Sequence, residues 1–452
     1  MHILKGYTKQ EISWMMYDWA NSAHSVIIVT LLPIFFDTVA GYTADSVSSM
    51  STWGYATSIA MLIVALSAPF LGVFGDIRGM RKKLFSFFML LGVAACAGMA
   101  FTPGMDFTSG PVVAGKVASL ILVLYIVSVI GFDASAIYYD AFLTDVTIED
   151  RMDKVSTMGY GLGYIGGSTI PLLIFLIMNL VGVPMLTCLA FVFGLTAVWW
   201  LAFSLPLLKN CEQTSGKPYE KGDVARSMKG VGTTIKEIIA NKPMLIYILS
   251  YFFYIDGVHT VISMATTYGT NLGLDSTGMM LALLLVQILG LPFCLLYIKC
   301  SEKFGARTMV GFGICVYMFI CIFAFFMNSL WQFWVLAVLC ATSQGGIQAL
   351  SRSMYGKLIP DKDRSGEFFG FFDIFGKFSS IMGPALVGVV SSVVANGMLG
   401  AQGLTAQTAT AEQIDAINAQ SSHYGILSII IIIIVGAVLY FGFLPKAEHA
   451  KQ

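Results

Sequence analysis

Twelve long apolar stretches, separated by polar segments, dominate this sequence. A membrane-spanning helix needs about 20 mainly apolar residues in succession, and each stretch is long enough to form one. Apolar residues make up 57% of the chain and charged residues only 12%, so one water-soluble core could not cover the apolar surface. We therefore predict an all-α membrane protein with twelve transmembrane helices. Their approximate ranges are 11–39, 51–75, 82–103, 116–142, 154–181, 184–208, 242–270, 276–299, 308–327, 330–352, 366–395 and 423–445.

One long polar segment divides these stretches into six and six. We expect a six-helix bundle over 1–208, a linker over 209–241 and a second six-helix bundle over 242–452. Apolar residues recur at helical spacing between Asp223 and Lys242, which predicts an amphipathic helix on the membrane surface. A short helix is also expected around Glu412 to Asn418.

The basic residues predict the orientation of the chain. All but two of the 26 Lys and Arg residues lie at the termini or in connections on one side, and the exceptions are Lys116 and Lys377. Because loops rich in Lys and Arg stay in the cytoplasm, we expect both termini to be cytoplasmic. A bacterial inner membrane, which is a plasma membrane, is the expected location.

A very tight turn joins the second and third stretches. Its pattern, Gly-x3-Asp-x2-Gly-x-Arg, resembles the signature loop of the major facilitator superfamily, and a weaker copy follows the eighth stretch. Two copies indicate a duplicated fold of two pseudo-symmetric six-helix halves. The residues that carry the two copies are Gly72, Asp76, Gly79 and Arg81, and Glu302, Gly305 and Arg307.

The resemblance to this superfamily implies a gating role for both turns. The carboxylate of Asp76 is expected to face the start of the eleventh helix, here Ser365 to Glu367, where free N–H groups and the helix dipole favour an anion. Arg151 or Arg364 would add a charge partner. We therefore assign gating to the residues of both turns and to these two arginines.

Polar side chains deep in a bilayer are costly, so they mark paired or functional groups. Stretches 2, 3, 6, 9 and 12 carry no ionisable group between their ends. In the superfamily, helices 3, 6, 9 and 12 are peripheral, so the remaining polar groups predict a central substrate cavity. For any single residue the alternative is a structural network, such as Asp373 paired with Lys377 one turn later. The expected substrate-binding residues are Asn21, His24, Asp133, Tyr164, Asp256, His259, Gln287, Gln344, Gln348, Asp373 and Lys377.

Four of the buried ionisable groups could also change protonation when they lose water. They are Asp18, His24, Asp133 and Asp256, and we expect proton coupling rather than sodium coupling. The fifth stretch contains Gly159, Gly163 and Gly167 at G-x-x-x-G spacing, which allows close helix packing. We expect that packing at the interface between the halves.

Several classes of protein are disfavoured. The eight cysteines show no C-x-x-C spacing, and neither a P-loop nor an H-E-x-x-H sequence occurs. A membrane enzyme built on Asp18, His24, Asp256 and His259 is the rival, but no metal-site spacing supports it. We expect no enzyme activity, no metal and no cofactor. A formal net charge of zero suggests no nucleic-acid partner, and a monomer in the lipid bilayer is expected.

Two strings resemble one subfamily more closely. They are Trp14 to Ala23, and Gly345 to Ser353 with its continuation through Glu367–Gly370, Gly376–Ser380 and Gly383-Pro384. Both resemble the autophagy-related vacuolar effluxer-like family of major facilitators, whose fungal members have an extended central domain that is absent here. The resemblance implies a secondary transporter with alternating access that exports or exchanges a small polar solute, an amino acid or related metabolite. A lipid flippase and a non-transporting solute receptor of the same fold are the alternatives.

Overall fold

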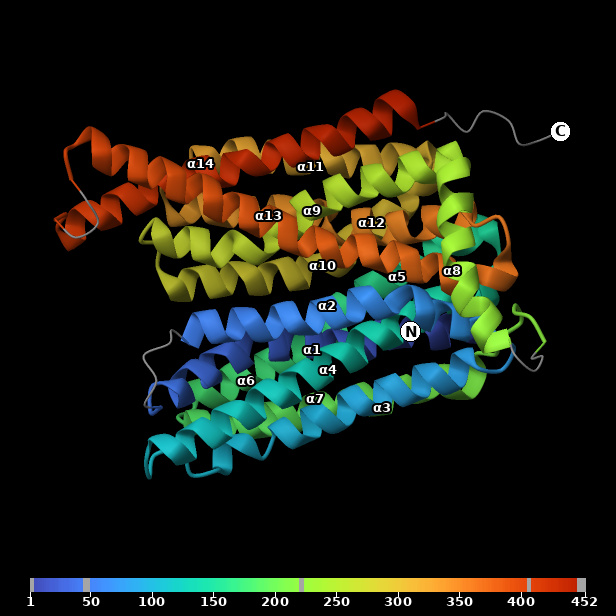
Figure 1. Ribbon diagram of the computed structural model, residues 1–452, viewed down its shortest axis with the longest axis horizontal. Coiled ribbons are helices and arrows are strands. Elements are labelled where there is room, and N and C mark those ends of the chain that lie inside the picture. Colours follow the sequence, from blue (N-terminus) through green and yellow to red (C-terminus); the bar gives the residue numbers. More distant parts are fainter. Residues whose placement is uncertain (1–3, 44–48, 219–222, 405–407, 445–452) are drawn as a thin grey trace. The chain divides into compact units, whose positions relative to one another are not determined.

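The computed structural model describes residues 4–43, 49–218, 223–404 and 408–444 (Figure 1). Helices make up most of this part of the chain, and its only β-bridge joins Ile77 and Lys217. Twelve of the described helices are long and apolar enough to cross a membrane. The predicted all-α fold with twelve transmembrane helices is confirmed.

The helices before the linker are α1 (Lys9–Ala40), α2 (Ser49–Gly75), α3 (Arg81–Met99), α4 (Pro111–Val146), α5 (Met152–Gly163), α6 (Ile170–Leu180) and α7 (Met185–Asn210). The linker forms α8 (Asp223–Ala240), which confirms the helix expected there, while its place on the membrane surface stays a prediction. The remaining helices are α9 (Lys242–Asn271), α10 (Ser276–Phe304), α11 (Ala306–Phe325), α12 (Leu330–Leu358), α13 (Ser365–Ala401) and α14 (Ala411–Val438).

The last helix begins well before residue 423, where the apolar stretch begins. Thr410 caps α14 by accepting a hydrogen bond from the N–H of Gln413, whose side chain bonds back to Thr410. This reciprocal capping box satisfies two end groups of the helix. The short helix expected around Glu412 to Asn418 is therefore the first part of α14.

The fifth membrane span runs from Glu149 to Leu180 and changes geometry in the middle. Tyr164–Thr169 forms a π-helical segment between α5 and α6. Pro171 follows this segment, and a proline inside a helix lacks an N–H and displaces the carbonyl four residues earlier. Segments of π-helix are rare in proteins overall, but those that occur are often found at functional sites.

The glycines of this span face α1. A Cβ atom added at Gly163 would lie 2.5 Å from the Ser22 hydroxyl, and one added at Gly167 would lie 2.6 Å from the backbone nitrogen of Ala23. The predicted close packing is therefore present. Its partner is a helix of the same half, however, and not the other half as expected, because α1 fills the space in front of these glycines.

Contacts divide the chain into two compact units. The first comprises Met1–Thr234 with Gly356–Ile374, and the second comprises Ile235–Tyr355 with Phe375–Gln452. In the first unit, Trp14 stacks on Tyr139 with ring centroids 4.4 Å apart and so joins α1 to α4. In the second, α9 packs against α14. The segment Gly356–Ile374 follows the linker in sequence but packs with the first unit.

Candidate functional site

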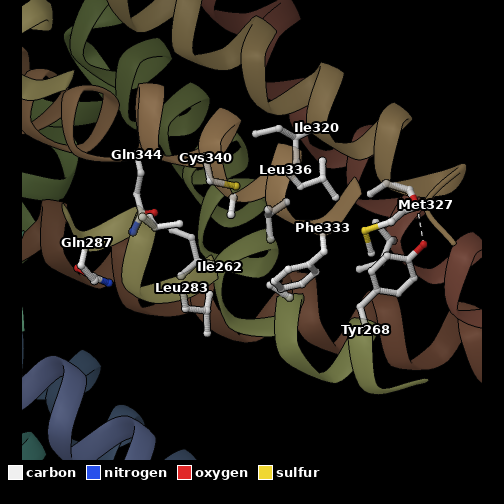
Figure 2. Close-up of a pocket in the computed structure, with 16 residues that line it drawn as sticks. Ile262, Tyr268, Leu283, Gln287, Ile320, Met327, Phe333, Leu336, Cys340 and Gln344 are labelled. Atoms are coloured by element: carbon white, nitrogen blue, oxygen red, sulfur yellow. Dashed lines mark hydrogen bonds between the residues drawn. The ribbon is translucent and has the colours of Figure 1, made fainter. Parts of the chain in front are cut away.

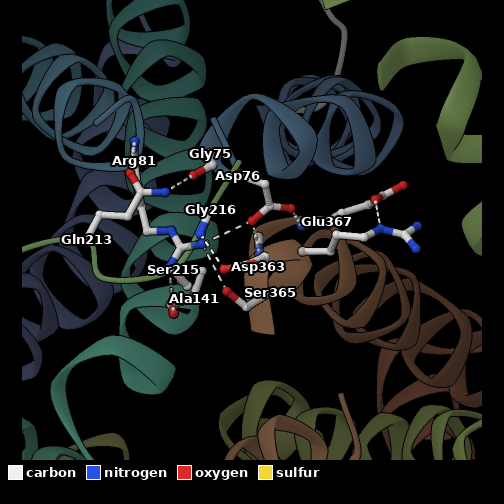
Figure 3. A network of polar contacts seen from close by, with 12 residues as sticks. Gly75, Asp76, Arg81, Ala141, Gln213, Ser215, Gly216, Asp363, Ser365 and Glu367 are labelled. Carbon is white, nitrogen blue, oxygen red and sulfur yellow. Dashed lines mark hydrogen bonds and ion pairs between the residues drawn. The ribbon is translucent and has the colours of Figure 1, made fainter. Parts of the chain in front are cut away.

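Arg81 is the centre of a polar network at the turn between α2 and α3 (Figure 3). Its guanidinium group is fully buried and donates hydrogen bonds to the carboxylates of Asp76, at 3.0 Å, and Asp145, at 2.5 Å. The planar fork of an arginine allows one side chain to contact two carboxylates. Its other hydrogen bonds go to the hydroxyls of Ser215 and Ser365 and to the carbonyl of Ala141.

Asp76 also caps the start of α13. Its two carboxylate oxygens accept the N–H groups of Gly366 at 2.7 Å and Glu367 at 2.8 Å. The first N–H groups of a helix have no partner within the helix and carry the positive end of its dipole, so an anion is favoured there. The expected contact of Asp76 with Ser365 to Glu367 is present, and its gating role stays a prediction. The charge partner that the structure shows for Asp76 is Arg81.

Small residues bring the backbones of α2 and α13 together at this point. A Cβ atom added at Gly72 would lie 2.2 Å from the carbonyl oxygen of Gly366, and one added at Gly370 would lie 2.5 Å from the carbonyl oxygen of Ala68. Neither approach leaves room for a larger side chain. Gly79 has a φ of +81°, a conformation that favours glycine, and so allows the chain to turn within a few residues.

The start of the linker lies across this turn as a strap, which we define as residues Cys211 to Lys217. Gln213 accepts the N–H of Gly79 at 2.9 Å and donates to the carbonyl of Gly75 at 2.9 Å. Gly216 donates its N–H to Asp363, just before α13, at 2.8 Å. The strap therefore connects the turn to the segment that leads into α13.

Further contacts hold the middle of the strap and its first residue. Asp145, at the end of α4, accepts the N–H and hydroxyl groups of Thr214 and Ser215. The Cys211 thiol donates to the carbonyl of Gln10 at 3.6 Å. Burial raises the pKa of this thiol to about 12, so it is neutral at physiological pH and unreactive.

The two arginines expected near Asp76 have other partners. Arg151 makes two hydrogen bonds to the Glu11 carboxylate, at 2.8 and 2.7 Å. Arg364 contacts Glu367 at 3.1 Å and also the hydroxyl of Thr234 on α8. Arg151 therefore connects the segment before α5 to the start of α1, and Arg364 connects the segment before α13 to α8.

The weaker second turn keeps part of this pattern. Gly305 has a φ of +82° and starts α11, as Gly79 precedes α3. Glu302 is exposed at the end of α10. Arg307 donates to the carbonyl of Leu444 at 2.7 Å and so contacts the end of the last span. The second turn thus repeats the positive φ of the glycine. Its arginine bonds to a backbone carbonyl, whereas Arg81 bonds to carboxylates.

Two predicted site residues of the first unit lie on α1 beside α4 and α5. The Asp18 carboxylate accepts the hydroxyl of Tyr139 at 2.8 Å, and a Cβ atom at Gly159 would lie 2.4 Å from the same oxygen. Asn21, one turn after Asp18 on the same helix, is also buried. These groups belong to the packed contact between helices of one unit.

His24 lies in an aromatic environment. Its ring stacks on Phe132 at 4.7 Å, lies 5.3 Å from Trp200, and its Nε2 is 3.2 Å from the hydroxyl of Ser128. Only 2% of its surface is exposed, and the same fraction applies to Asp133 one residue after Phe132. Tyr164, also a candidate, is half-buried and opens the π-helical segment.

Asp256 is the most enclosed polar candidate of the second unit, with 0% exposure. Its Oδ1 accepts the N–H of Gly383 at 2.9 Å and the hydroxyl of Thr260 at 3.3 Å. Oδ2 is buried, and none of the described residues hydrogen-bonds to it. A Cβ atom at Gly383 would lie 2.6 Å from Oδ1, so only glycine allows this approach.

The other polar candidates of the second unit are partly exposed. Lys377 on α13 interacts electrostatically with His259 on α9, and both side chains are half-buried. Gln348 is half-buried too, as is Asp373, which the contacts assign to the first unit. The predicted pair of Asp373 and Lys377 stays a prediction.

Gln287 and Gln344 lie together at one end of a pocket within the second unit (Figure 2). Most of the pocket wall is apolar and comes from α9, α10, α11, α12 and α14. The structure thus groups these two amides with apolar neighbours.

Sequence reasoning missed Asp145, Gln213 and Ser215, which complete the network of Arg81. A signal for Asp145 was available in the sequence. This carboxylate follows the fourth apolar stretch, on the same predicted side of the membrane as the turn with four basic residues. The partner of Arg151, Glu11, could have been found as the third residue of a capping box with Thr8. The strap has no hydrophobic period, so nothing in its sequence predicted a fixed position.

Comparisons with known proteins agree with this architecture. The family described as "Vacuole effluxer Atg22 like" matches residues 7–397. The chain is 40% identical to the uncharacterized MFS-type transporter YxiO of Bacillus subtilis (strain 168), over 98% of this chain and 96% of that protein. It is 25% identical to autophagy-related protein 22-1 of Penicillium rubens, over 55% of this chain and only 46% of the fungal protein.

A solved structure, that of the MFS proton:xylose symporter XylE bound to 6-bromo-6-deoxy-D-glucose, matches with a TM-score of 0.72. It covers 97% of this chain and 96% of the symporter at 14% identity, which shows a shared fold. The chain is thus an integral multi-pass membrane protein and a transporter, not an enzyme. It belongs to the Atg22-like vacuole effluxer family of the major facilitator superfamily.

Proposed function

We propose that this protein is a secondary active transporter that moves an amino acid, or a related small polar metabolite, by proton-coupled alternating access. Both termini face the cytoplasm, and the protein lies in a bacterial inner membrane and acts as an exporter or exchanger. The observation that carries the proposal is the carboxylate of Asp256. It is buried at mid-helix, and one of its oxygens has no hydrogen-bond partner among the described residues.

Such a group costs free energy unless a ligand or a proton completes it. The backbone N–H of Gly383 and the hydroxyl of Thr260 fix its position, so Oδ2 is held ready for a donor. An ammonium group or a proton would serve equally well. Asp256 therefore acts either as the receptor of the substrate amine or as the site of proton coupling.

Lys377 would bind the substrate carboxylate. Nearly all other Lys and Arg residues of the sequence lie at the termini or in the connections on one side of the membrane. Lys377 and Lys116 are the two exceptions. His259 on α9, a neighbour of Lys377, adds a group that can donate a hydrogen bond. A lysine and a carboxylate in the same unit supply the two opposite charges that a zwitterionic amino acid requires.

Transport by purified protein in proteoliposomes tests the proposal. Uptake of labelled amino acids is expected with a pH gradient and is expected to stop when a proton ionophore is added. If Asp256 is the coupling site, Asp256→Asn should retain exchange of labelled substrate and lose accumulation driven by the gradient. If Asp256 receives the substrate amine, the same variant should lose both. If sodium replacement abolishes transport while the ionophore has no effect, the proton assignment is wrong.

The role of Lys377 is tested separately with a matched control. Lys377→Met should abolish substrate binding, and Lys116→Met should not, because Lys116 is exposed at the start of α4. Adding Asp373→Leu to Lys377→Met removes both charges and so restores folding if the pair is only structural. Recovery of substrate affinity in this double variant would rule out Lys377 as the carboxylate receptor.

A further inference from the structure

The pocket of the second unit is lined by uncharged residues, in contrast to the charged candidates described above. It is a cavity of about 100 Å³ formed by side chains from five helices (Figure 2). None of the sixteen residues that line it carries a formal charge. Leu283, Phe333 and Leu336 are representative of its wall, and Cys340 adds a thiol.

The polar groups of the pocket are found at its two ends. At one end, the hydroxyl of Tyr268 donates to the carbonyl of Ala324 and lies 2.6 Å from Nδ1 of His423, so this group is satisfied within the protein. At the other end lie the amides of Gln287 and Gln344 (Figure 2). Oε1 of Gln287 is buried, and none of the described residues donates to it.

These features define a ligand. An acceptor that is buried without a donor costs about 1–3 kcal/mol, and a ligand with one N–H or O–H group would recover part of that cost. The absence of charge in the lining excludes ions and zwitterions, whose burial is expensive. An apolar cavity of about 150 Å³ can hold benzene, so this smaller one, which is partly open, suits a single ring or a short branched chain.

We propose that this pocket is a binding site for an uncharged, largely apolar small molecule that carries one hydrogen-bond donor, with Gln287 as its acceptor. Depth alone grouped Gln287 and Gln344 with the charged residues. Their apolar neighbours assign them to a site of a different chemical class from the one proposed around Asp256 and Lys377.

Phenol and toluene are matched probes, because they differ by one hydroxyl in place of a methyl group. Binding of each to the full chain in lipid nanodiscs can be measured by saturation-transfer NMR. Ala337→Phe fills the pocket, since Ala337 is a buried wall residue, and the signal that remains in this variant measures partition into lipid. Cys340→Met provides a smaller filling if the first variant does not fold.

The saturable signal is expected to disappear in both filled variants. Gln287→Leu should weaken phenol binding about tenfold, which is the upper range for one hydrogen bond, and leave toluene binding unchanged. Gln402→Leu is the control, because Gln402 is an exposed amide of the same unit outside the pocket.

Three results would overturn the proposal: equal signals in the wild type and both filled variants, equal loss of phenol and toluene in Gln287→Leu, or loss of phenol binding in Lys377→Met. The last variant also separates the two sites. Phenol binding is measured without transport, so it stands or fails independently of the amino-acid proposal.

Discussion

Replacement of Arg81 tests the network at the α2–α3 turn most directly. The guanidinium is 0% exposed and makes five hydrogen bonds, two of them to carboxylates. A lysine has one nitrogen with three donors and cannot contact both Asp76 and Asp145 in the same way. Arg81→Lys therefore loses at least two bonds to polar groups, and hydrogen bonds to charged groups contribute about 1.5–3 kcal/mol each.

We expect Arg81→Lys to destabilise the network by about 3 kcal/mol, the sum of two such bonds at the lower limit. Arg81→Met leaves two carboxylates buried without a cation and should cost about 3–5 kcal/mol. Arg78→Met is the matched control, because Arg78 lies in the same turn but is exposed. Its effect should stay within about 0.5 kcal/mol.

Hydrogen–deuterium exchange gives a local readout. The N–H groups of Gly366 and Glu367 bond to Asp76, so their exchange reports on opening of this contact. A loss of about 3 kcal/mol corresponds to exchange roughly 150-fold faster. Peptides covering Ser365 to Glu367 should show this change in Arg81→Lys, with little change in peptides of α9.

The reasoning fails if both Arg81 variants leave exchange of Ser365 to Glu367 unchanged while the protein as a whole loses stability. That result would mean that Arg81 stabilises α3 and α4 without acting on Asp76. Exchange that is as fast in Arg78→Met as in Arg81→Met would also contradict this role of Arg81. The cause would then be the net charge of the turn and not the buried contacts.

Two further predictions concern the same region. Gly72→Ala should lower the free energy of unfolding by about 1–3 kcal/mol, because its Cβ would lie 2.2 Å from the Gly366 carbonyl. Gly54→Ala on the same helix is the control, because a Cβ atom there meets nothing within 4 Å. Equal melting temperatures of the two variants would contradict the close approach. Gln213→Ala should loosen the strap and speed proteolysis within the linker, because the side chain bonds to two backbone groups of the turn. Exposed Glu212 provides the control, and equal proteolysis of Gln213→Ala and Glu212→Ala would show that the strap does not depend on this glutamine.

The sequence predicted those features that depend on a bilayer or on a local rule. The thickness of the hydrocarbon core fixes how many apolar residues a span needs, so all twelve spans could be found. The resemblance of the α2–α3 turn to the superfamily's signature loop implied that Asp76 faces the start of α13, where a helix start attracts an anion. The strap could not be placed, because its position depends on backbone groups of the α2–α3 turn and on the side chains of Asp145 and Asp363, which meet only in the folded chain.

Depth in the membrane was predictable, whereas the direction of a side chain around its helix was not. The rise per residue places a residue along the helix axis, but a shared depth does not mean a shared cavity. Gln287 shows the difference, because its position in the sequence places it at the depth of the charged candidates, but it lines a pocket whose other residues are mainly apolar. The uniform hydrophobicity of a membrane helix gives little information about which face is turned inward.

The surroundings of each side chain also rank the candidates for proton coupling. His24 stacks on one aromatic ring, lies close to another, and contacts a hydroxyl, so packing alone explains its burial. Asp18 has the hydroxyl of Tyr139 as partner. Asp256 differs, because its position is fixed by two donors to Oδ1 while Oδ2 has no donor among the described residues. A carboxylate held in this way changes its interactions most when a proton or an ammonium group arrives, so Asp256 is the residue at which coupling should be sought first.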